Sequence, residues 1–246
     1  MFPIHDTIPT RHPPIAVWLL VFLNGVMFYL ELKLSPQRLE DLFYLFGVVP
    51  ARFVHPAWAQ AIGFPIHTYW PFITYMFLHA GWMHIIGNMW FFWVFGRTVE
   101  DRMGPARFLG FYLLCGVVAA VVQTYAAANS TVPSVGASGA IAGVMGAYLV
   151  MFPRARIITL IPILIFPLFF DLPAVFFLLF WFGLQLFSGA MSLANPQHVG
   201  GIAFWAHVGG FLTGIVLHRL FLARRPTPRP PARDEGVAAK VWGSEH

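Results

Sequence analysis

One serine in a glycine-rich apolar stretch is the residue of this chain best placed to do chemistry. Ser138 lies in the stretch SVGASGAIAGVMGAY, and no charged residue occurs from Ser138 to Phe152. A helix of about fifteen residues spans roughly 22 Å, whereas the hydrocarbon layer of a membrane is roughly 30 Å thick. Such a helix, ending next to Arg154 at one membrane surface, begins below the other surface. Ser138 is therefore expected inside the bilayer, beside irregular backbone that must line a wet cavity, and this arrangement suggests hydrolysis.

Two histidines and an asparagine in other apolar stretches complete the candidate site. His84 and Asn88 are four residues apart and so share one face of a helix, and His207 lies near the start of the last apolar stretch. Polar and ionisable residues inside spans are costly, which makes each of them a functional candidate. Acyl transfer requires a nucleophile and a base, here Ser138 and His207. The free N–H groups at the start of the Ser138 helix, together with His84 and Asn88, are candidate donors to an oxyanion.

Small residues give the helices of the site a reason to approach closely. The residues expected to support this packing are Gly136, Gly139, Gly143 and Gly146 around the serine, and Ala206, Gly210 and Gly214 around the histidine. No acidic residue is placed to orient His207, so a Ser-His dyad without a third member is expected. Three neutral residues within spans are interpreted as helix-to-helix hydrogen bonders, namely Asn24, Gln123 and Gln185. His79 and His198 are interpreted as structural.

The composition indicates an all-α polytopic membrane protein. Hydrophobic residues make up 58% of the chain and charged residues 10%, with a mean hydropathy of +0.69. Continuous apolar runs, without alternation, are not typical of a membrane barrel. We expect a bundle of six transmembrane helices, at residues 15–30, 82–95, 108–128, 138–152, 172–190 and 202–222. Neither a zinc motif nor a pair of intramembrane aspartates is present, and no metal or cofactor is expected.

The charge pattern predicts the topology. All but three of the 15 Lys and Arg residues fall on the side that holds both termini, which assigns the termini to the cytoplasm. The exceptions are Lys33, Arg38 and Arg52. The basic residues lie between spans, not on one soluble face, so nucleic acid is not an expected partner.

The expected organisation has three parts. A short cytoplasmic N-terminus (1–14) precedes the membrane domain (15–222), and a disordered, Pro- and Arg-rich cytoplasmic tail (223–246) follows it. Within the membrane domain, a long aromatic first loop (31–81) is expected in the outer interface. The apolar segment 157–167, which two prolines interrupt, is expected to lie at the inner interface and lead into the fifth span, or else to be part of a tilted span.

Three motifs of the chain, in order and spacing, resemble those of rhomboid intramembrane serine proteases. They are His79-Ala-Gly-Trp-Met-His84-Ile-Ile-Gly-Asn88, Gly136-Ala-Ser138-Gly139 and Ala206-His207-Val-Gly-Gly210-Phe-Leu-Thr-Gly214. The resemblance, over about residues 70–222, implies a six-helix core, Ser138 as nucleophile, His207 as base, and His84 and Asn88 at the oxyanion. Two departures stand out. Pro71 follows Trp70 where some members have an arginine, so any role of that arginine in anchoring the loop is absent here. Ala142 replaces an aromatic residue on which the histidine stacks in some members, so another group must orient His207.

The expected function is that of an intramembrane serine endopeptidase. Its partners would be membrane lipid and single-span proteins whose spans are locally destabilised, cut in the outer part of the span. Its expected location is multi-pass in a bacterial inner (plasma) membrane. One alternative is a catalytically inactive rhomboid-like protein that binds membrane clients, against which the retention of Ser138 and His207 argues. The other is a channel or transporter, against which the lack of ionisable residues in the inner half of the spans argues.

Overall fold

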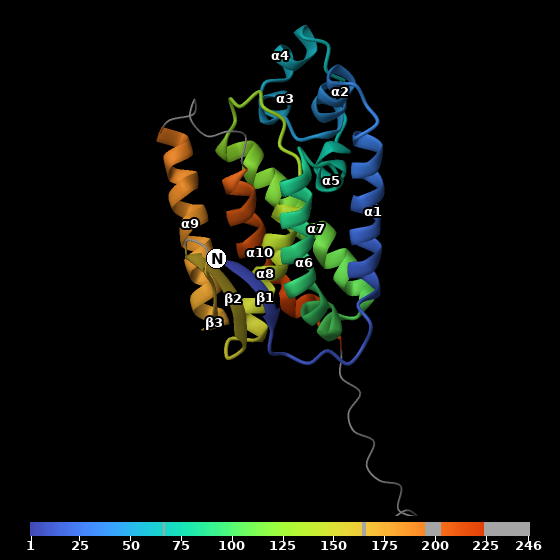
Figure 1. Cartoon of the computed structure of the whole chain (residues 1–246). Helices are drawn as coiled ribbons and strands as arrows, with labels where there is room; N and C mark the ends of the chain where they lie inside the picture. Colours follow the sequence, from blue (N-terminus) through green and yellow to red (C-terminus); the bar gives the residue numbers. More distant parts are fainter. Residues whose placement is uncertain (66, 164–165, 195–202, 224–246) are drawn as a thin grey trace, which may run out of the picture.

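The computed structural model describes residues 1–65, 67–163, 166–194 and 203–223, and in these ranges the chain is mainly a bundle of long helices (Figure 1). The long helices are α1 (Ile15–Glu31), α6 (Trp82–Met103), α7 (Pro105–Ala126), α8 (Ser138–Met151), α9 (Ala174–Ala194) and α10 (Phe204–Phe221). Each coincides with one of the six predicted spans. By length and composition, α7 and the part of α9 from Ala174 to Leu193 can cross a membrane, whereas α1 and α8 are shorter apolar helices. The number of spans therefore stays a prediction. His198 and residues 224–246, which are the predicted tail apart from Ala223, lie outside the described residues.

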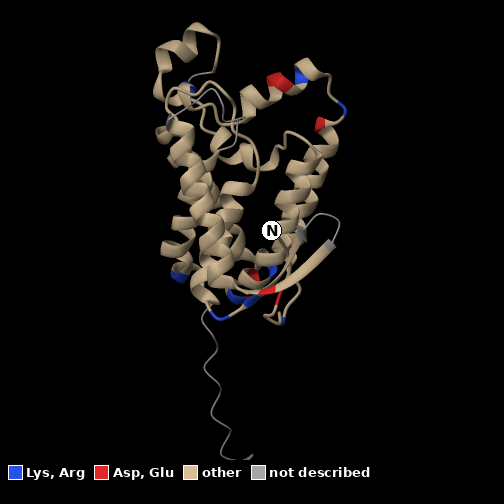
Figure 2. Ribbon diagram, turned by 60° about the vertical axis from the view of Figure 1, so that its left-hand side comes forward, with Lys and Arg blue, Asp and Glu red and all other residues tan. Residues whose placement is uncertain are grey.

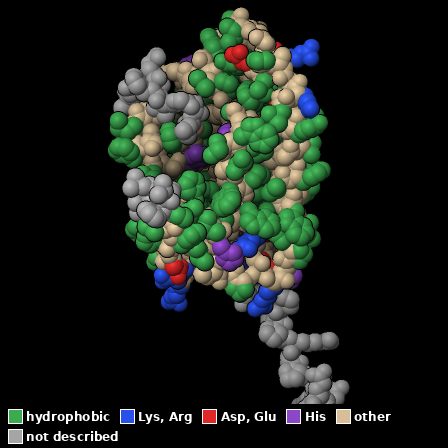
Figure 3. Space-filling model, in the orientation of Figure 1, with side chains coloured by type: hydrophobic (Ala, Val, Ile, Leu, Met, Phe, Trp, Pro, Cys, Tyr) green, Lys and Arg blue, Asp and Glu red, His purple; other side chains and the backbone are tan. Residues whose placement is uncertain are grey.

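The surface of the bundle is apolar around its middle. Many large apolar side chains on the long helices are exposed, including Phe22, Phe187 and Leu220. Figure 3 shows such side chains spread over the whole height of the bundle, and Figure 2 shows that acidic and basic residues gather at its two ends. Exposed apolar surface of this extent is typical of a face that meets lipid or another apolar partner.

The first loop folds into short helices at one end of the bundle. These are α2 (Pro36–Phe46), α3 (Pro50–Val54), α4 (Pro56–Ala61) and α5 (Pro71–Thr74), followed by a 3₁₀ turn at Tyr75–Phe77. Proline occupies the first turn of all four α-helices, where its missing N–H group has no helical partner to lose.

Arg52 is buried within this loop and holds it together. Its guanidinium donates to the carbonyl oxygens of Leu45 and Pro65, each at 3.1 Å, and to Thr68 Oγ1. The charge pattern of the sequence only assigns Arg52 to the outer side of the membrane and gives it no structural role. The structure gives it a structural role, because a buried guanidinium must find acceptors for its N–H groups, and here these acceptors come from three parts of the loop.

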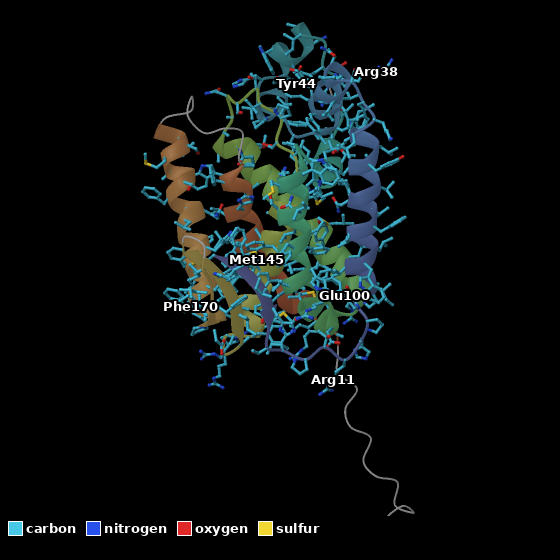
Figure 4. The ribbon with its side chains drawn as sticks, in the orientation of Figure 1. Arg11, Arg38, Tyr44, Glu100, Met145 and Phe170 are labelled. Atoms are coloured by element: carbon cyan, nitrogen blue, oxygen red, sulfur yellow. The ribbon has the colours of Figure 1, made fainter. Side chains whose placement is uncertain are left out.

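A three-stranded antiparallel sheet shows that the all-α expectation is wrong for two segments. The strands are β1 (Phe2–Asp6), β2 (Arg156–Ile163) and β3 (Phe166–Pro173), in the order β1-β2-β3. β2 contains a β-branched run that favours extended backbone, and its proline, like those of β3, disfavours a helix interior. The expected interfacial segment is thus a pair of strands, and Phe170 projects from β3 away from the bundle (Figure 4). The N-terminal segment contributes the edge strand β1 to this sheet.

Two carboxylates tie the N-terminal segment to the bundle. Asp6 is fully buried and accepts hydrogen bonds from Arg97 Nη2 at 2.8 Å, Thr98 Oγ1 at 2.7 Å and Tyr148 OH at 3.0 Å. Glu100, labelled in Figure 4, accepts from the first N–H groups of α1 at 2.9 and 2.8 Å. Unpaired N–H groups at a helix start favour such a carboxylate.

α8 and α10 touch backbone to backbone. A β-carbon at Gly210 would collide with the carbonyl oxygen of Gly139, and one at Gly214 would collide with the carbonyl oxygen of Gly143. A β-carbon at Gly143 would also lie 2.5 Å from the β-carbon of Cys115 on α7. The close approach predicted from small residues is therefore confirmed for these two helices, and any larger side chain would push them apart.

Candidate active site

Ser138 and His207 lie in direct contact. Ser138 is the first residue of α8, His207 lies in the first turn of α10, and the distance from Ser138 Oγ to His207 Nε2 is 2.7 Å. Both residues are partly buried. The contact follows from the glycine-mediated packing of α8 on α10, because a serine side chain is too short to reach a histidine across ordinary helix spacing of 8–10 Å. The structure therefore brings together the two residues predicted as nucleophile and base.

The other face of His207 contacts α9. His207 Nδ1 lies 2.8 Å from Gln185 Oε1, and the ring of Trp181 lies at 5.8 Å between ring centroids, tilted by 40°. Gln185 bridges two helices, as predicted. Its partner is the ionisable His207, which the sequence interpretation did not identify. The available signal was the four-residue spacing of Trp181 and Gln185, which places both on one face of a helix. These two residues contact the imidazole, whereas Ala142 offers no ring for it to stack on.

His84 and Asn88 face the turn that leads into α8. Gly136 has φ +119°, and a β-carbon there would lie 2.6 Å from His84 Nε2 and 3.3 Å from Asn88 Nδ2. Gly136 was expected to support helix packing, which is wrong in detail. It is a turn glycine, needed because a side chain would strain the backbone and strike His84. Asn88 Nδ2 has no hydrogen-bond partner among the described residues.

The donors around Ser138 point to a site for negative charge. His84 Nδ1 accepts from the Ala80 N–H group at 3.4 Å, which leaves the proton of a neutral ring on Nε2, facing Gly136. The first N–H···O bond of α8 runs from Ile141 to Ala137, at 3.0 Å, so the N–H groups before Ile141 have no helical acceptor. Backbone and side-chain donors thus gather at the helix start, as an oxyanion requires.

The remaining polar residues have mixed outcomes. Gln123 accepts from the N–H group of Ala206 on α10, as predicted, whereas Asn24 bonds back to Leu20 within its own helix. His79, interpreted from the sequence as structural, lies just before the start of α6. Its ring packs edge-on against His84 at 5.1 Å.

The described residues offer no group of three or more His, Cys, Asp or Glu side chains that could hold a metal ion. On the face seen in Figure 3, histidine side chains are visible in a hollow between α9 and α6, in the half of the bundle nearer the loop helices.

Comparison with known proteins agrees with these motifs. The Rhomboid domain family matches residues 67–224. The chain is 34% identical to YdcA of Bacillus subtilis (strain 168) over 53% of this chain and 70% of that protein. It is 25% identical to Rhomboid protease GlpG of Haemophilus influenzae over 78% and 83% of the two chains. It is 32% identical to the chloroplastic Rhomboid-like protein 11 of Arabidopsis thaliana over 49% of this chain, and spans only 39% of that relative. The chain belongs to the membrane-embedded rhomboid family.

Proposed function

We propose that this chain is an intramembrane serine endopeptidase that uses Ser138 as nucleophile and His207 as general base. The observation that carries the proposal is the 2.7 Å contact between Ser138 Oγ and His207 Nε2 beside a helix start with free donors. The protease names of relatives such as GlpG of Haemophilus influenzae support the same class of activity. We further propose the six-span topology with cytoplasmic termini. A bacterial inner membrane remains the expected location.

The proposed reaction has two stages. His207 Nε2 takes the hydroxyl proton as Ser138 Oγ attacks the scissile carbonyl carbon, and the resulting oxyanion is stabilised by the N–H groups at the start of α8 with His84 and Asn88. His207 then gives the proton to the leaving amine as the C–N bond breaks. His207 then takes a proton from water as the water oxygen attacks the acyl-enzyme, and gives that proton to Ser138 Oγ as the ester C–O bond breaks.

The proposed substrates follow from backbone chemistry. A helical span hides its carbonyl groups in i to i−4 hydrogen bonds, so Ser138 can attack only where a substrate helix has opened. Single-span proteins with Gly, Pro or Ser in the outer part of the span are therefore proposed as substrates. The family resemblance adds a preference for a small residue just before the cut.

The test uses purified chain in proteoliposomes with two single-span substrates that differ only in a Gly-Ala or Leu-Leu pair near the outer end of the span. Wild type should cut the Gly-Ala span faster, at an outer site mapped by mass spectrometry. Ser138→Ala and His207→Ala should be inactive, with the double variant little worse than either, because paired groups act as a unit. Cleavage by Ser138→Ala at the wild-type rate would end the protease proposal. Binding without cleavage by wild type would favour the inactive client-binding alternative.

A further inference from the structure

The side-chain amide of Gln185 has two partners that together fix its orientation. Its Oε1 lies 2.8 Å from His207 Nδ1, and its Nε2 lies 3.4 Å from the carbonyl oxygen of Trp181. A carbonyl oxygen can only accept a hydrogen bond, so the NH₂ group of the amide must face Trp181. The amide oxygen therefore faces His207. Gln185 thus presents an acceptor, and not a donor, to the imidazole.

This orientation determines which ring nitrogen of His207 carries the proton. An acceptor at Nδ1 requires an N–H group there, and a neutral imidazole has only one N–H group. The lone pair is then left on Nε2, which faces Ser138 Oγ at 2.7 Å. This is the tautomer that a general base needs, since the opposite tautomer would present an N–H group to the serine hydroxyl.

No other described residue provides this selection. The two side-chain hydrogen bonds of His207 among the described residues are those to Gln185 and Ser138, so none of these residues acts as the carboxylate of a catalytic triad. The ring of Trp181 packs beside the imidazole but accepts no hydrogen bond from Nδ1, and Ala142 has no ring to offer. Loss of the amide would leave Nδ1 without its partner and let the proton sit on either nitrogen.

We propose that Gln185 is a positioning residue that holds His207 in the base-competent tautomer and orientation, in place of the acidic residue of a triad. The inference rests on the proposed protease function. A neutral amide selects the tautomer without placing a charge beside the imidazolium. Gln185 acts on the orientation and the protonation site of the ring, and it touches no reacting atom.

The experiment compares Gln185→Leu, which removes the acceptor, with Gln185→Glu, which restores one. The matched control is Gln123→Leu, because Gln123 also bridges to α10, at Ala206, yet does not touch the imidazole. Three properties are measured: kcat and KM for the Gly-Ala substrate, the rate of Ser138 labelling by a fluorophosphonate, and the imidazole ¹⁵N shifts of His207, assigned by difference from His207→Ala. Should Gln185→Leu fail to fold, Gln185→Met removes the acceptor with an unbranched chain.

Gln185→Leu should lower kcat and the labelling rate by about 10–100-fold with little change in KM, which is the range typical when a metal-bound histidine loses the hydrogen-bond partner of its other ring nitrogen. Its ¹⁵N shifts should show a mixed tautomer, and Gln185→Glu should recover most of the rate. Gln123→Leu should retain both the rate and the wild-type shifts. Wild-type labelling and unchanged shifts in Gln185→Leu would overturn the inference. If wild type itself neither cuts nor is labelled, the proposed function fails, while the ¹⁵N shifts still report whether Gln185 sets the tautomer.

Discussion

Gly136→Ala would test whether the turn before Ser138 is fitted to His84. The new β-carbon would lie 2.6 Å from His84 Nε2 and 2.7 Å from Cε1, while the backbone stays at φ +119°. The backbone conformation alone costs a residue other than glycine roughly 1–2 kcal/mol. The contact must also be relieved, by moving either the imidazole or the segment that carries Ser138.

The size of the effect follows from the contact distance. Non-bonded heavy atoms rest at about 3.5 Å, so relief requires a displacement of roughly 0.9 Å. A displacement of about 1 Å in a catalytic arrangement costs about 10²-fold in rate, or about 2.7 kcal/mol of transition-state stabilisation. We therefore expect Gly136→Ala to be about a hundred times slower than wild type, in addition to a small loss of stability.

Two other glycines provide matched controls for the backbone cost. Gly63 and Gly104 have φ +88° and +78°, and a β-carbon at either would meet no atom within 4 Å. Gly63→Ala and Gly104→Ala should therefore lose stability without a hundredfold loss of rate. The assay is the initial rate of substrate cleavage in proteoliposomes, with thermal unfolding of each variant measured in parallel. If Gly136→Ala lost no more activity than the two controls, the fit between Gly136 and His84 would have no catalytic role.

Two further predictions concern the oxyanion donors and the N-terminal anchor. Asn88→Ala should remain a slow enzyme, about 10²–10³-fold below wild type in kcat, because one donor is lost while others remain; complete inactivity, equal to that of Ser138→Ala, would show that Asn88 does more than donate. Asp6→Ala should lower the free energy of unfolding by about 3 kcal/mol, since it leaves the largely buried Arg97 without its carboxylate. Denaturant unfolding in detergent measures this loss, and an unchanged midpoint would contradict the anchoring role of Asp6.

The parts of the site that lie on continuous apolar runs could be predicted from the sequence. Ser138 and His207 were found because a polar group inside an uncharged run is rare and costly, and the glycines that bring them together follow a spacing that helix geometry explains. The helix positions follow from the same runs. In each case the signal was local, within one turn or two of the chain.

The missed features depend on contacts between distant segments. β1 pairs with β2 across about 150 residues, and nothing within Phe2–Asp6 indicates a partner strand. Gln185 is neutral, so its role depends on the rotation of α9 about its own axis, which packing against α10 decides. Arg52 is buried only because distant parts of the first loop fold around it, and the sequence next to it does not indicate this. Composition indicates which residues avoid water, but not which neighbours they meet.

The contact between Ser138 and His207 depends on the packing of α8 against α10, whereas the hydrogen bond that supports His207 depends on α9. Backbone contact at Gly210 and Gly214 makes α8 and α10 one stiff unit, so their spacing cannot change without a large cost. α9 exposes much of its apolar surface, and it carries Gln185. An outward shift of α9 by about 1 Å would stretch the 2.8 Å bond at Nδ1 beyond hydrogen-bond range, yet leave Ser138 and His207 in contact. The orientation and the protonation site of His207 are thereby coupled to the position of α9.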